Sequence, residues 1–156
     1  MYMLSKAIFF VTFFIAISCS SIKRDNIEYI IYGVYTGECF EHCATMYKLE
    51  KDRLYVDTTD SFFKNDNNVR FSDHVLGDEE FEKALIVKNQ LPELLLKSNV
   101  EEFGSPDGHD QGGIFIEIKS GATIKRFYID TVLDRIPKEL RGYAKLIMKM
   151  RGFTSL

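Results

Sequence analysis

The sequence predicts an α+β fold in which one antiparallel sheet, made of two strand or hairpin units, carries helices packed on one of its faces. Runs of β-branched and aromatic residues separated by polar turns occur early in the chain and again towards its end. Segments with helical spacing of apolar residues lie between and after these runs. Consecutive strands with helices between them are typical of an α+β domain. With 156 residues, 46% of them hydrophobic and 28% charged, the chain has room for one such domain and a short leader.

Residues 1–18 have the features of a secretory signal peptide. Lys6 precedes an uncharged, apolar run at residues 7–18. A helix of that length would reach about 18 Å, whereas the hydrocarbon core of a bilayer is roughly 30 Å thick. The run is therefore too short to span a membrane, and it matches the apolar region of a signal peptide.

Cys19 follows this run directly and is preceded by the small residue Ser18. A small residue before a cysteine at this point resembles the lipobox of bacterial lipoproteins, in which the cysteine is acylated and becomes the mature N-terminus. The alternative is an ordinary signal peptide followed by an unmodified cysteine. We expect lipidation at Cys19, a polar tether at residues 19–26 and attachment to the membrane through the lipid. The expected location is the bacterial cell envelope, on the outer membrane facing the periplasm.

A single folded domain is expected at residues 27–152, and it begins with strands. Residues 27–36 are rich in β-branched and aromatic residues on both faces, which predicts a strand that is central or covered on both sides. A second strand at 44–50, a polar turn at 51–53 and a third strand at 54–58 predict an antiparallel meander.

A polar, asparagine-rich connection at residues 60–73 leads into a helical region. Three of its side chains are expected to pack onto the body: Phe62, Phe63 and Phe71. Asp78 is the expected N-cap of a helix that Pro92 ends, and a second short helix is expected at 92–97. The apolar run at 84–87 leaves a strand open as the alternative.

The last part of the chain predicts a hairpin followed by a helix. Residues 114–119 alternate, Ser120 and Gly121 supply a turn, and residues 123–130 return. Pro137 suits the first turn of the final helix. One side of that helix is basic: Lys138, Arg141, Lys145 and Lys149. This stripe is either a solvated helix face or a contact for anionic head groups or a partner.

Cys39 and Cys43 remain as an even pair once the lipid-bearing cysteine is set aside, which favours one disulfide in an exported chain. An extended strand would separate them by about 13 Å, so a disulfide requires the chain between them to turn. Three alternatives stay open. Cys39, His42 and Cys43 could bind zinc or copper with His109 or Asp110 as a fourth ligand. The two cysteines could act as a redox pair in thiol–disulfide exchange, or one cysteine could act as a nucleophile beside His42.

Residues 104–113 form a loop with four glycines and a proline. Asp107, His109 and Asp110 make it polar, and such a loop could hold a cation or a polar ligand. The alternative is a turn whose aspartates bond to nearby backbone amides. A hydrolase that uses His109 with Asp107 or Asp110 is a further hypothesis, although no nucleophile or paired base is specified.

Residues 37–49 read GECFEHCATMYKL and resemble the G-x-C-F-x-x-C-P-x-Y-x-L motif of an uncharacterised family of Bacteroidetes-type envelope lipoprotein domains. Ala44 stands where the motif has proline, and Tyr47 comes one residue later than the motif's tyrosine. The later order of helix, hairpin and helix is also similar to that family. The resemblance implies an α+β envelope domain and implies no particular activity.

The sequence therefore predicts a lipid-anchored envelope domain that binds or scaffolds another envelope protein and is not an enzyme. The alternative is a metal-binding or thiol-redox protein that uses Cys39, His42 and Cys43. The formal net charge of −3 argues against nucleic acid as a partner, because phosphates are neutralised by a basic excess. No cofactor is expected.

Overall fold

The computed structural model describes residues 21–37, 39–57, 59–62, 69–108 and 111–150. These residues form one six-stranded sheet with the strand order β3-β2-β1-β5-β6-β4. The strands are β1 (Tyr29–Tyr35), β2 (Ala44–Leu49), β3 (Leu54–Val56), β4 (Glu102–Phe103), β5 (Gly113–Ser120) and β6 (Thr123–Ile129). The α-helices are α1 (Asp78–Asn89), α2 (Glu93–Lys97) and α3 (Lys138–Met150), and short 3-10 turns lie at Arg24–Asn26 and Leu133–Arg135.

β1 lies in the middle of the sheet and pairs antiparallel with both β2 and β5. Its burial explains why its sequence is apolar on both faces, since all but its first residue are buried. The meander of β1, β2 and β3 and the hairpin of β5 and β6 run antiparallel, as the sequence predicts. The α+β class is confirmed.

The expectation of a wholly antiparallel sheet was wrong, because β4 runs parallel to β6 at the edge of the sheet. Glu102 lies opposite Tyr128, and Phe103 lies opposite Ile129. A strand of two residues is too short to show any hydrophobic period, so its sequence gives no strand signal. β4 follows α2 in the chain and runs in the same direction as β6, which makes the sheet mixed.

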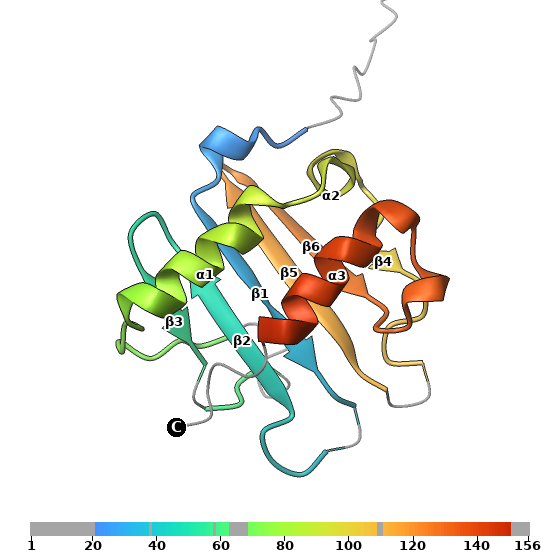
Figure 1. Ribbon diagram of the computed structural model, residues 1–156, viewed down its shortest axis with the longest axis horizontal. Coiled ribbons are helices and arrows are strands. Elements are labelled where there is room, and N and C mark those ends of the chain that lie inside the picture. Colours follow the sequence, from blue (N-terminus) through green and yellow to red (C-terminus); the bar gives the residue numbers. More distant parts are fainter. Residues whose placement is uncertain (1–20, 38, 58, 63–68, 109–110, 151–156) are drawn as a thin grey trace, which may run out of the picture.

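The described helices cover one face of the sheet, where α1 and α3 lie across the strands (Figure 1). The larger apolar core lies between them and the sheet, and it includes Ile30, Ile116, Phe127, Leu140 and Ile147. The opposite face, which we call the second face, carries a smaller apolar cluster. Its buried members are Ile31, Tyr35, Ala44, Met46, Phe62 and Phe115.

The connection after β3 supplies part of the cover on the second face. Phe62 is 1% exposed and packs between the rings of Tyr35 and Phe115, at centroid distances of 5.1 and 5.0 Å. Phe71 is partly buried against the same cluster. Both outcomes match the expectation for this connection, while Phe63 lies outside the described residues.

α1 begins one residue earlier than expected, because Gly77 is its N-cap and Asp78 is its first helical residue. Its first turn contains three acidic side chains, which suits the positive end of the helix dipole. The strand alternative for residues 84–87 was wrong, since these residues lie within α1. α2 starts after Pro92, close to the position that the proline predicted.

α3 buries one apolar side against the sheet, as its spacing predicts, with Leu140, Ala144 and Ile147 each 1% exposed or less. On its opposite side Lys138, Lys145 and Lys149 are exposed to solvent. Arg141 differs from these lysines, since its guanidinium bonds to the Asp134 carboxylate at 3.2 Å.

The N-terminal segment is packed onto the body, which corrects the expected tether at residues 19–26. Ile22 is 6% exposed, and its N–H donates to the Leu96 carbonyl at 3.1 Å. Arg24 donates from its guanidinium to three backbone carbonyls at the end of α1: Lys88, Asn89 and Leu91, at 3.3, 2.6 and 2.7 Å. Only the part before Ile22 remains as a candidate tether.

The described helices are all short. α3 is the longest of them with 13 residues, and none has the length and apolar character that crossing a membrane requires.

Candidate functional sites

Cys39 and Cys43 are bonded to each other in the connection between β1 and β2, and their Cα atoms lie 5.4 Å apart. The chain between them turns, as the disulfide geometry requires, and His42 has a left-handed backbone with φ of 56°. The Asp60 carboxylate fixes the end of this turn, because it accepts the N–H groups of Cys43 and Ala44 at 3.2 and 2.9 Å.

The loop closed by this disulfide is exposed to solvent. Cys39, Phe40, Glu41 and His42 are all exposed, and only Cys43 is buried. Bonded cysteines present no thiolate to a metal. Within the part of the chain that the structure describes, no group of three or more His, Cys, Asp or Glu side chains could hold a metal ion.

In the glycine-rich loop at residues 104–113, two hydrogen bonds join Asp107 to Gly112. The Asp107 N–H donates to the Gly112 carbonyl at 2.9 Å, and the Asp107 carboxylate accepts the Gly112 N–H at 3.1 Å. Asp107 thus forms the kind of turn that the structural alternative predicted. His109 and Asp110 lie outside the described residues, so the hydrolase hypothesis stays a prediction.

The two distinctive loops lie at the same end of the sheet. Gly112 has φ of 74°, and a Cβ placed there would lie 1.9 Å from the carbonyl oxygen of Tyr35, the last residue of β1. This close approach brings the end of the glycine-rich loop against the start of the disulfide connection. His42 belongs to the described residues and His109 does not, so their joint metal site stays a prediction.

A polar cluster that the sequence did not predict lies on the second face of the sheet. Tyr29 donates its phenolic O–H to Glu117 Oε1 at 2.8 Å, and Arg126 Nε donates to Glu117 Oε2 at 2.6 Å. The ammonium of Lys48 lies 4.9 Å from the centroid of the Tyr29 ring and 2.5 Å from a Glu50 oxygen. Glu117 is 5% exposed, so the carboxylate at the centre of the cluster is buried and satisfied by two donors.

Strand register brings these groups together. Ile31 of β1 lies opposite Lys48 of β2 on one side and opposite Glu117 of β5 on the other. Glu117 in turn lies opposite Arg126 of β6. A row of four side chains therefore crosses β2, β1, β5 and β6 on one face, because directly opposed residues point to the same side.

The cluster borders a cavity of about 340 Å³ that we call the face hollow. Its polar lining consists of Tyr29, Lys48, Glu117 and Arg126. Its apolar lining consists of Ile31, Val69, Phe71 and Ile124. Apolar walls with a few convergent polar groups are typical of small-molecule sites.

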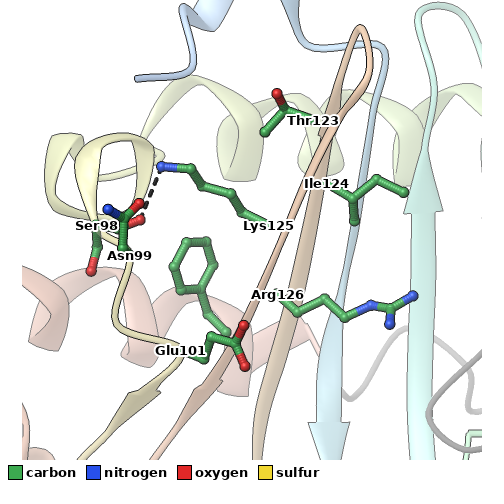
Figure 2. A pocket seen from close by; sticks show the side chains of 8 residues that line it. Ser98, Asn99, Glu101, Thr123, Ile124, Lys125 and Arg126 are labelled. Atoms are coloured by element: carbon green, nitrogen blue, oxygen red, sulfur yellow. Dashed lines mark hydrogen bonds between the residues drawn. The ribbon is translucent and has the colours of Figure 1, made fainter. Parts of the chain in front are cut away.

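A second cavity, of about 260 Å³, lies at the outer edge of β6 beside the segment that follows α2. Figure 2 shows that Lys125 reaches towards Ser98, while Ile124 and Arg126 point to the other side of the strand. The Lys125 ammonium donates to the carbonyls of Leu96 and Ser98, at 3.0 and 2.9 Å. This lysine fastens the chain after α2 to β6, so the edge cavity holds a structural contact.

Burial alters the acid–base behaviour of the polar cluster. Desolvation, together with the hydrogen bond to Glu117, raises the pKa of Tyr29 to about 12. The hydrogen bond to Glu117 also raises the pKa of Arg126. Near neutral pH the phenol therefore keeps its proton and donates a hydrogen bond to Glu117, while the guanidinium stays charged.

The sequence contained a weak signal for this cluster. Glu117 alternates with Ile116 and Ile118, so its strand pattern places it on the solvent side. However, the central strand at residues 27–36 is apolar on both faces, which indicates that the second face is covered too. A charged residue on a strand beside a doubly covered strand is then expected to need a partner.

Comparison of the chain with models of protein families, with curated proteins and with solved structures finds no match. The resemblance of residues 37–49 to Bacteroidetes-type lipoprotein domains therefore stays a prediction.

Proposed function

We propose that the chain is a lipid-anchored module of the bacterial cell envelope, held by acyl chains on Cys19, that binds or scaffolds another envelope protein. Residues 7–18 support export, and the small residue before Cys19 supports acylation. The disulfide between Cys39 and Cys43 fits an oxidising compartment such as the periplasm.

The observation that carries the proposal is the apolar run that ends at Ser18 and Cys19, and the folded body begins close behind it. Ile22 is buried and bonded to Leu96, three positions after Cys19. Because a chain spans at most about 3.6 Å per residue, the Cα atom of Cys19 would lie within about 11 Å of that of Ile22. Such an anchor would hold the end of the domain that carries α2 close to the bilayer and limit how far the domain can move away.

Metabolic labelling with radioactive palmitate in a bacterial host tests the anchor. The full chain should incorporate label, and Cys19→Ala should abolish it. The double variant Cys39→Ser/Cys43→Ser is the matched control, because it removes the other two cysteines and should keep the label. Label that persists in Cys19→Ala, or a mature chain that starts elsewhere by mass spectrometry, would refute the anchor.

Thiol counting and native mass spectrometry of the same protein test the metal or redox alternative. We expect no free thiol at Cys39 or Cys43 and no bound metal. Bound zinc or copper, or thiols that react without denaturation, would support a metal or redox function that uses these cysteines and His42.

A further inference from the structure

The two edges of the sheet end in different ways. Beside β3, Val75 forms a bridge to Tyr55, so the chain itself covers this edge. At the opposite edge, β4 pairs only with the end of β6, at Tyr128 and Ile129. Within the described chain, residues 123–125 at the start of β6 have no strand on their outer side. An edge of this kind offers its backbone groups to a further strand.

Ile124 directs its backbone groups to this outer side. Tyr128 donates its N–H outward to the Glu101 carbonyl at 2.7 Å. In an antiparallel ladder every second residue faces the same neighbour, and the register of β6 with β5 runs without a break from Thr123 to Ile129. Ile124 lies four positions before Tyr128, so its N–H and its carbonyl face the same outer side. It can therefore exchange two hydrogen bonds with an added strand.

The edge cavity, of about 260 Å³, leaves room on this outer side of β6. Its far wall is the segment after α2, which includes Ser98 and Asn99. Figure 2 shows Lys125 reaching towards this segment, while Ile124 points to the other side of the strand. Among the described residues, the backbone of this segment bonds to β6 only from Glu101 onward. The position next to Ile124 is therefore available to another extended backbone.

The side chains of an added strand would alternate between two different surroundings. On the second face they would lie beside Ile124, which is 47% exposed and belongs to the apolar lining of the face hollow. On the helix side they would face the polar segment that contains Ser98 and Asn99. The edge therefore suits a segment in which apolar residues alternate with small polar ones.

We infer that the start of β6 binds an extended segment of the partner protein, which adds to the sheet as a further strand beside Ile124. This inference rests on the proposed binding function, and it names the surface and the kind of segment that the partner supplies. β4 already pairs with the same edge as an extended segment, so the added strand continues an existing row and ends or turns away at Glu101. Addition of a strand to a sheet edge is a common mode of peptide recognition.

A phage-displayed library of short random peptides is the probe, selected on the full chain in a non-ionic detergent. Ile124→Pro removes the N–H that faces outward, and proline is tolerated at such a position of an edge strand. Ile124→Val is the matched control, because it keeps the N–H and a β-branched side chain. Selected peptides should bind the unchanged chain and Ile124→Val alike. They should bind Ile124→Pro at least about fivefold more weakly, as loss of a backbone hydrogen bond predicts.

Methylation of the peptide backbone tests the same point without any change to the chain, so the test stands even if Ile124→Pro fails to fold. Two forms of a selected peptide carry N-methyl groups on alternate amides, which blocks one or the other of its two edges. One form should lose binding and the other should keep it. The bound peptide should also slow deuterium exchange at the Ile124 amide and leave the amide of Ile86, in α1, unchanged.

Equal binding of the two methylated forms would overturn the inference, as would a library without binders or peptides that bind Ile124→Pro as they bind the unchanged chain. Dimers that Ile124→Pro abolishes would assign the edge to a second copy of the chain instead. Peptides that bind away from β6 would keep a binding function and reject this surface. Palmitate labelling at Cys19 is independent of these results, so failure of the edge and failure of the anchor are distinguishable.

Discussion

The Glu117 carboxylate and the Arg126 guanidinium face each other across β5 and β6, and Arg126 Nε lies 2.6 Å from Glu117 Oε2. Their exposures differ greatly, because the Glu117 side chain is 6% exposed and the Arg126 side chain is 39% exposed. The arginine thus brings its charge from the rim of the hollow to a carboxylate beneath it. Loss of Arg126 would therefore leave the buried Glu117 carboxylate without its charged partner.

Replacement of Arg126 by alanine should destabilise the fold by about 1–3 kcal/mol, because a buried carboxylate would keep only the Tyr29 hydroxyl as a donor. Urea denaturation measures the loss. Lys145→Ala on the exposed side of α3 is the control and should change the free energy of unfolding by less than about 0.5 kcal/mol. An Arg126→Ala variant as stable as this control would contradict a structural ion pair.

Tyr29 should make stability fall with rising pH between about 10 and 12. Its pKa in the folded state is about 12 against an ordinary value of 10.0, so the unfolded chain releases this proton first. The folded state then binds more protons than the unfolded state, and the free energy of unfolding decreases as pH rises through this window.

Tyr29→Phe should reduce that decrease, measured by urea denaturation at pH 9, 10 and 11. Burial also raises the pKa values of Tyr32, Tyr35 and Tyr143, so these residues contribute to the remaining slope. Parallel pH profiles for the unchanged chain and Tyr29→Phe would show that Tyr29 is not the source.

Removal of the disulfide should cost about 2 kcal/mol, the chain-entropy contribution for so small a closed loop. Cys39→Ser/Cys43→Ser is the variant, and its urea midpoint should match that of the unchanged chain in a reducing agent. The reducing agent should have no effect on the variant itself. If the reducing agent leaves the unchanged chain unaffected, the bond is absent or makes no contribution to stability.

Arg24→Ala should release the N-terminal segment without unfolding the sheet. Its guanidinium donates to three carbonyls at the end of α1, and a charge-assisted bond contributes about 1.5 kcal/mol or more. The amide of Ile22 should then exchange with deuterium about tenfold faster, since its bond to Leu96 opens more often.

Arg53→Ala is the matched control for this change, because Arg53 is exposed in the turn between β2 and β3. It should leave the exchange of Ile22 as it is. Trypsin provides a second readout, with faster cleavage after Lys23 in Arg24→Ala alone. Unchanged exchange and unchanged cleavage would mean that burial of Ile22 by itself holds the segment.

Much of the fold follows from local patterns. The alternation of residues 114–119 predicts β5, and Ser120 with Gly121 predicts its turn into β6. The apolar spacing of Leu140, Ala144 and Ile147 predicts the buried side of α3. Such elements repeat a pattern over several residues, and the pattern is set by which side of each element meets water.

The two candidate sites differ in how far the sequence could predict them. The bond between Cys39 and Cys43 is a local feature, and the even number of these cysteines in a chain that is expected to be exported is enough to favour it. The polar cluster is non-local, because Tyr29 and Glu117 are 88 positions apart. They meet only because β1 pairs with β5 in one register, and a shift of one residue would turn every side chain of the strand to the opposite face.

The sequence by itself thus determined the α+β class, most of the strands and helices, the turn between Cys39 and Cys43, and the expectation of export. Tertiary structure alone decided that β4 joins β6 in parallel, that Ile22 and Arg24 fasten the N-terminal segment, and that Glu117 is buried with Tyr29 and Arg126. The physical reason is that periodicity records burial within an element, while pairing between distant elements depends on how their surfaces fit and on which backbone groups must be satisfied.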